Sequence, residues 1–270
     1  MKQSRIFKVF LLGISVFFIF SCRSSTITLE PFCEILIDET DGIVNLRKEA
    51  DFSAKAITRI PLKNKVIKKL GISNDEKWIN LQYGDHTGWG NVSYVSCRYV
   101  PADAQSIVAE PALHVMNAIR KNNWAAVSKF VHPIKGVRFS PYAFVSIETD
   151  QVYKSNELGQ AIGNKDKRVW GVNDGSGDPI SLSFGEYVER YIRKHNYWES
   201  KAVTYNQFAD GETANNNIIE TYPHTIVVEY SLADLDTAVH ATSWSKLRLV
   251  FEKSNNTWFV VGIMHSSWTI

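Results

Sequence analysis

The chain has 270 residues, of which 44% are hydrophobic and 12% aromatic, a composition that supports well-packed globular cores. Its 30 basic and 28 acidic residues give a formal net charge of only +2, which offers no electrostatic reason to expect a nucleic-acid partner. Because the first 21 residues hold three of the basic side chains, the rest of the chain has 27 basic residues against 28 acidic ones.

The N-terminal segment has the three parts of a secretory signal: a positive stretch, an apolar run over residues 9–20, and the small residue Ser21. As a helix this run would reach about 18 Å, too short for a hydrocarbon core of about 30 Å. The residues Ile19-Phe20-Ser21-Cys22 resemble a bacterial lipobox, which implies a signal peptide over residues 1–21 and acylation of Cys22. An incidental cysteine after an ordinary signal peptide is the alternative. In that family Arg23, which is not acidic, favours the outer membrane or cell surface.

Residues 22–32 are predicted to be the lipidated cysteine and a short polar tether. Cys33 and Cys97 are then the remaining cysteines, and export would place them where disulfides persist. A bridge between them would close a loop of roughly 64 residues and contribute about 4 kcal/mol in the chain-entropy model. The alternative is a pair of free thiols buried as small hydrophobic groups.

Short runs of β-forming residues at regular spacing predict a small all-β unit after the tether. They cover residues 35–37, 44–47, 56–60, 66–70, 78–83 and 87–90. The strings Val44-Asn45-Leu46-Arg47, Trp78-Ile79-Asn80-Leu81 and Gly88-Trp89-Gly90-Asn91-Val92-Ser93-Tyr94-Val95 resemble a bacterial Src-homology-3-type (SH3b) domain. Gly90 departs from the valine that is usual there.

The resemblance implies an SH3-like barrel over residues 33–100, whose terminal strands lie close enough for a Cys33–Cys97 bridge. It also implies a candidate peptide groove lined by aromatic side chains, namely Trp78, Tyr83, Trp89 and Tyr94. Aromatic residues also form the cores of such barrels, and at least two of these four are expected to do so.

Residues 103–270 have the pattern of an α+β domain, with helices packed on a curved antiparallel sheet. Helices are expected over 104–122, over 123–131 with Asn123 as N-cap, and from the capping box Ser183-Phe184-Gly185-Glu186 to about Lys194. Strands are expected over 201–208, 218–232, 243–253 and 257–264, with a tight turn at Ser254-Asn255-Asn256. This order is similar to the nuclear-transport-factor-2-like cone.

Candidate catalytic or ligand-binding residues lie in an unusual stretch, His132-Pro133-Ile134-Lys135-Gly136-Val137-Arg138-Phe139-Ser140-Pro141-Tyr142. This stretch and the terminal His-x-x-Trp-Thr-Ile resemble uncharacterised secreted bacterial proteins. His132 or His265 would serve as acid or base, Arg138 as an anion ligand and Tyr142 as a hydroxyl donor. The alternative is a structural role, in which His132-Pro133 ends a helix and Phe139-Ser140-Pro141-Tyr142 forms a packed corner. Common phosphate-loop, zinc-helix and nucleophile-elbow motifs are absent from the sequence, and neither a metal nor a cofactor is expected.

The leading hypothesis is a non-enzymatic binding protein, held to the membrane by its lipid anchor, that recognises a cell-wall peptide or an envelope protein. The SH3b resemblance motivates the peptidoglycan version. The second hypothesis is a hydrolase or lyase whose site lies in residues 103–270, with the SH3b-like unit as a targeting module.

Overall fold

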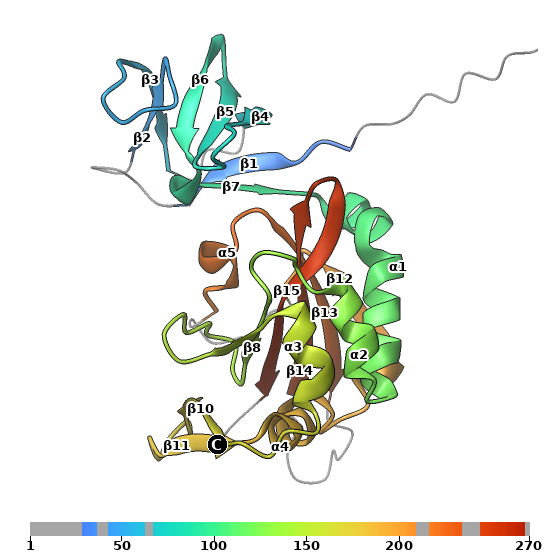
Figure 1. Ribbon diagram of the computed structural model, residues 1–270. Helices are drawn as coiled ribbons and strands as arrows, with labels where there is room; N and C mark the ends of the chain where they lie inside the picture. Colours follow the sequence, from blue (N-terminus) through green and yellow to red (C-terminus); the bar gives the residue numbers. More distant parts are fainter. Residues whose placement is uncertain (1–28, 37–42, 63–66, 209–215, 234–243, 268–270) are drawn as a thin grey trace, which may run out of the picture.

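The computed structural model describes residues 29–36, 43–62, 67–208, 216–233 and 244–267 of the chain. In this part of the chain an N-terminal β-sheet is followed by a C-terminal sheet that carries the helices (Figure 1). Cys22, the predicted lipidation site, lies outside the described residues, as does the Trp268-Thr269-Ile270 end of the terminal motif.

The N-terminal sheet has seven antiparallel strands in the order β3-β2-β6-β5-β4-β1-β7. Alternation along β5 places Ile79 and Leu81 in its core, with Val44, Leu46 and Val95 from neighbouring strands. Among the described residues no pairing joins β3 to β7, so the sheet is not a closed barrel. The bounds are β1 (Phe32–Ile35), β2 (Ile43–Arg47), β3 (Ala56–Pro61), β4 (Ile67–Ile72), β5 (Trp78–Tyr83), β6 (His86–Asn91) and β7 (Val95–Arg98), with the 3-10 turn η1 (Val92–Tyr94) before β7.

The C-terminal sheet has six strands in the order β12-β13-β14-β15-β8-β9, and only the β8–β15 pair is parallel. Asn255 and Asn256, both at positive φ, join β14 to β15 in the expected tight hairpin. A separate β-hairpin consists of β10 (Arg168–Val172) and β11 (Pro179–Leu182). The sheet strands are β8 (Val137–Ser140), β9 (Gln151–Tyr153), β12 (Ala202–Tyr205), β13 (Thr225–Ala233), β14 (Trp244–Ser254) and β15 (Thr257–Ser267).

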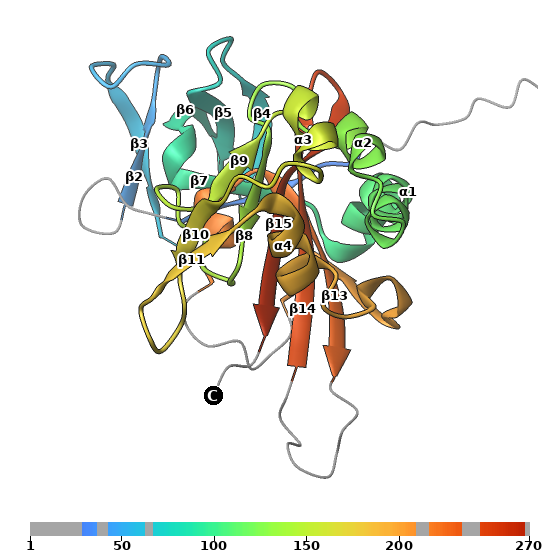
Figure 2. The same ribbon diagram turned by 60° about the horizontal axis from the view of Figure 1, so that its bottom comes forward.

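Helices cover one face of the C-terminal sheet, as the α+β pattern predicts (Figure 2). The long helix α1 (Pro101–Arg120) begins with proline at its first turn and buries one apolar stripe that includes Val108, Val115 and Ile119. Asn123 caps α2 (Trp124–Val127), and Ser183 caps α4 (Phe184–Tyr187) through the expected capping box. The remaining helical segments are η2 (Ser128–Phe130), α3 (Ser155–Ala161), the π-helical turn η3 (Val188–Ile192), η4 (Tyr197–Glu199) and α5 (Ile218–Thr221).

Hydrogen bonds join the N-terminal sheet and the residue after it to loops of the C-terminal region. The backbone N–H of Cys97 and the hydroxyl of Ser96 both donate to the Pro223 carbonyl, at 3.1 and 2.7 Å. The side chain of Asn206 donates to the Tyr99 carbonyl at 2.8 Å. In Figure 1 the β14–β15 hairpin reaches up to the level of β1 and β7.

One expectation for the C-terminal region needed correction. The strand predicted over 218–232 begins instead with the short helix α5, and β13 starts only at Thr225. In addition, α3, β9 and the two strands of the β10–β11 hairpin had no sequence prediction. Within the described residues no helix is both long and apolar enough to cross a membrane.

Candidate functional site

The predicted disulfide between Cys33 and Cys97 is present. The two residues face each other on the antiparallel pair β1–β7, with their Cα atoms 4.0 Å apart. Both side chains are buried in the core of the N-terminal sheet, and an Arg98–Glu34 ion pair joins the same two strands. The bridge therefore fixes β1, the first described strand, to β7, which leads into α1.

The four aromatic side chains of the predicted peptide groove divide between two faces of the N-terminal sheet. Tyr83 and Tyr94 pack against the hydrophobic core, as expected for at least two of the four. Trp78 lies on the opposite face, where its ring meets that of Phe52 at 4.7 Å, and Trp89 shares that face because it pairs with Asn80. The four thus do not line one surface.

His132 and Gly136 form a tight turn before β8. The His132 Nδ1 atom accepts the backbone N–H groups of Ile134 and Lys135, at 3.2 and 3.0 Å. Gly136 adopts a φ of +79°, and a Cβ there would lie 2.6 Å from the Tyr153 carbonyl oxygen. Burial lowers the pKa of His132. Because Nδ1 already accepts two backbone bonds, this imidazole has a clear structural role.

Arg138 holds the loop between β8 and β9. Its guanidinium donates to the carbonyls of Ser146, Ile147 and Asp150, all at 3.2–3.3 Å, and its Nε donates to the Tyr222 hydroxyl. The Asp150 carboxylate accepts bonds from Ser140 Oγ at 2.5 Å and from the Ser146 N–H at 2.9 Å. Burial raises the pKa of Asp150 to about 6, against the effect of these bonds.

Tyr142 and His265 both contact the Tyr191 ring, whose centroid lies 6.4 Å from that of Tyr142 and 5.5 Å from that of His265. His265 Nδ1 is 3.0 Å from the Pro141 carbonyl, and burial lowers the pKa of this imidazole to about 4. The neutral ring must donate from Nδ1, so Nε2 faces the Ser245 hydroxyl at 3.5 Å as an acceptor. The Tyr142 hydroxyl accepts the backbone N–H of Asp174.

The four candidate catalytic residues therefore do not converge. Arg138 pairs in register with Gly262, whereas His265 lies three residues farther along β15 on the face that α1 covers. The two motifs nonetheless form one unit, because β8 pairs with β15 and His265 bonds back to Pro141. Among the described residues no three histidine, cysteine, aspartate or glutamate side chains gather as metal ligands.

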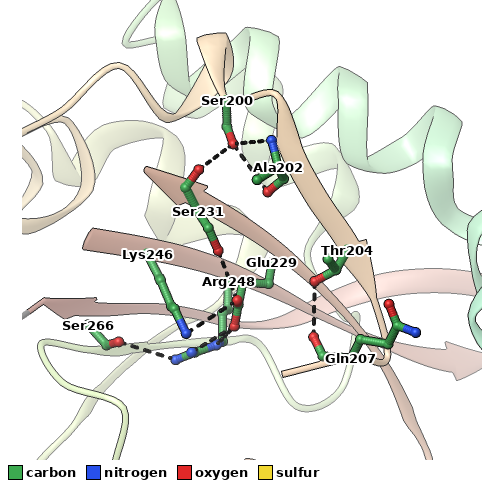
Figure 3. A network of polar contacts seen from close by, with 9 residues as sticks. All are labelled: Ser200, Ala202, Thr204, Gln207, Glu229, Ser231, Lys246, Arg248 and Ser266. Atoms are coloured by element: carbon green, nitrogen blue, oxygen red, sulfur yellow. Dashed lines mark hydrogen bonds and ion pairs between the residues drawn. The ribbon is translucent and has the colours of Figure 1, made fainter. Parts of the chain in front are cut away.

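A buried ionic cluster lies on the sheet face opposite α1, and sequence reasoning did not identify it (Figure 3). The Glu229 carboxylate lies 2.7 and 2.8 Å from two nitrogens of Arg248 and 3.5 Å from the Lys246 ammonium, and it accepts the Ser231 hydroxyl at 2.9 Å. Glu229 and Arg248 are both fully buried. The available signal was a single glutamate within the apolar strand β13, together with Lys246 and Arg248 two positions apart in β14.

A groove with a volume of about 760 Å³ lies between the two sheets, and we call it the intersheet groove. The N-terminal sheet contributes Lys69 and Cys97, and the C-terminal region contributes His224, Lys253 and Trp258. The Tyr99 and Trp258 rings meet edge to face at 5.9 Å in its lining. Its charged lining residues are balanced, with Lys69, Lys135 and Lys253 against Glu76, Glu220 and Glu252.

Burial and nearby cations keep His224, in the lining of the groove, in its neutral form. Burial lowers the pKa of His224 to about 4, and the ammonium groups of Lys69 and Lys135 lower it further, so the imidazole is neutral at pH 7. Its Nδ1 lies 3.4 Å from the backbone N–H of Cys97. Lys135 forms an ion pair with Glu252 at 2.5 Å.

No sequence motif predicts this groove, because its lining residues come from segments that are far apart in the chain. Comparison of the chain with known proteins finds no matching family model and no similar curated protein.

Proposed function

We propose that the protein is an envelope-anchored, non-enzymatic binding module that holds a cell-wall peptide in the intersheet groove. In this proposal Cys22 carries the lipid anchor, and residues 33–100 act as an SH3b-like unit that supplies one wall of the groove. The C-terminal α+β region, nuclear-transport-factor-2-like in its element order, supplies the other wall.

The observation that carries the proposal is the size, position and lining of the groove. A volume of about 760 Å³ falls in the range of ligand pockets, which are often found where two structural units meet. An aromatic pair, Tyr99 with Trp258, offers apolar contact area, and the equal numbers of lysines and glutamates suit a ligand that has charges of both signs. A cell-wall peptide, with free carboxylate and ammonium groups, has this character.

A pull-down of the full chain with purified peptidoglycan tests the proposal. Wild-type protein should be retained, and Trp258→Ala should weaken retention because it removes apolar contact from the groove. Trp89→Ala is the matched control, since Trp89 is also partly buried but lies outside the groove lining.

If peptidoglycan retains no wild-type protein above the background of a lipid-free control, wall binding is contradicted. Loss of retention in Trp89→Ala alone would place the ligand on the outer face of the N-terminal sheet instead. Capture of a defined envelope protein through the groove, with no binding to peptidoglycan, would favour the protein-partner version.

The hydrolase or lyase hypothesis has less support. Its four residues hold backbone groups in place, and His265 is nearly fully buried. General acid–base chemistry requires groups that converge on a substrate, and His132, Arg138 and His265 do not converge.

A further inference from the structure

Two lysine side chains from different sheets line the intersheet groove. Lys69 lies on β4, in the N-terminal sheet, and Lys253 lies near the end of β14, in the C-terminal sheet. Burial lowers the pKa of Lys69, and the charge of Lys253 lowers it further, which means that the two ammonium groups repel each other. Within the described residues neither ammonium has a salt-bridge partner.

The other basic side chains of the groove do not add a further unpaired cation to Lys69 and Lys253. The ammonium of Lys135 is paired with Glu252, and His224 is neutral at pH 7. Glu30 and Glu76 favour the charged form of Lys69, but less strongly than burial and Lys253 oppose it. Lys69 and Lys253 are therefore the lining lysines without an ion-pair partner among the described residues, and a bound anion would relieve their mutual repulsion.

We propose that Lys69 and Lys253 form a carboxylate-binding subsite of the intersheet groove. The subsite takes the free carboxylate of the bound peptide, and in this respect the inference rests on the proposed function. The anion lies between the two sheets and contacts both, so that binding ties the sheets together. A carboxylate fits better than a phosphate, because the doubly charged group would also face Glu76, Glu220 and Glu252 in the same lining.

Calorimetric titration of the full chain with two synthetic cell-wall peptides tests this subsite. One peptide ends in a free carboxylate, and the other is its C-terminal amide. The amide should bind about tenfold more weakly, since a neutral group gains nothing from the two cations. Lys69→Met and Lys253→Met should each reduce this difference, whereas Lys55→Met, at an exposed position outside the groove, should leave it unchanged.

The possible failures of the two proposals can be told apart. If wild type binds acid and amide equally well, the carboxylate subsite is wrong while the proposed peptide binding stands. If neither peptide binds, the proposed function fails. The subsite is then tested separately: the lysines are methylated, and their NMR signals are followed during titration with acetate and with inorganic phosphate. Acetate-induced shifts confined to the NMR signals of Lys69 and Lys253 would support the carboxylate subsite. No shift of these signals, or a larger shift with phosphate, would overturn it.

Discussion

Substituting Glu229 by glutamine tests the buried ionic cluster most directly. The carboxylate is fully buried and lies within 2.7–3.5 Å of Arg248 and Lys246, so its removal leaves two buried cations beside a neutral amide. Breaking a buried ion pair by removing one partner typically costs about 3–5 kcal/mol. We expect Glu229→Gln to lower the free energy of unfolding by an amount in that range, measured by urea denaturation with tryptophan fluorescence.

Glu189→Gln is the matched control, because Glu189 pairs with Arg193 at the protein surface and exposed pairs contribute about 1 kcal/mol or less. The double variant Glu229→Gln/Arg248→Met should lose less stability than the sum of its single substitutions, since it also removes one of the two cations. Equal losses in Glu229→Gln and Glu189→Gln would refute the view that this cluster is strongly coupled.

Three further predictions concern stability. Tyr187→Phe should raise the free energy of unfolding by about 1 kcal/mol, because the buried Tyr187 hydroxyl has no hydrogen-bond partner in the part of the chain that the structure describes. Tyr197→Phe should lower it by removing the 2.5 Å bond to Ser245, and thermal denaturation of both variants checks the opposite signs. Asp150, with its raised pKa, contributes stability that is lost as the pH rises from about 4 to 6, and Asp150→Asn should abolish that loss in urea midpoints measured across this range. Reducing Cys33–Cys97 should cost about 4 kcal/mol, and an unchanged urea midpoint with reductant would contradict it.

The sequence predicted those elements whose signals are local. Asn123 and the Ser183 capping box mark helix starts because the side chains bond backbone groups within three residues. The Asn255-Asn256 turn was readable because asparagine tolerates positive φ. By contrast, the β-branched start of 218–232 suggested strand, but residues 218–221 form one helical turn within the tertiary structure.

The candidate site was much less predictable than the fold. The segment from His132 to Tyr142 combines residue types that are common in active sites, yet here its polar groups hold turns and loops together. Only the structure shows which hydrogen bonds these side chains already make. The intersheet groove depends on long-range placement, since residues such as Lys69 and Lys253 are neighbours only after both sheets have formed.

The Cys33–Cys97 bridge also determines how the molecule would respond to a mechanical pull on its N-terminal end. A force applied ahead of β1 reaches Cys33, crosses the covalent bridge to Cys97, and continues through Arg98 into α1, which begins at Pro101. The segment between the two cysteines, whose sequence separation is 64, is thereby taken out of the load path. Strands β2 to β6 would bear no tension, and the wall of the groove that they support would keep its shape while such a force acts on the chain.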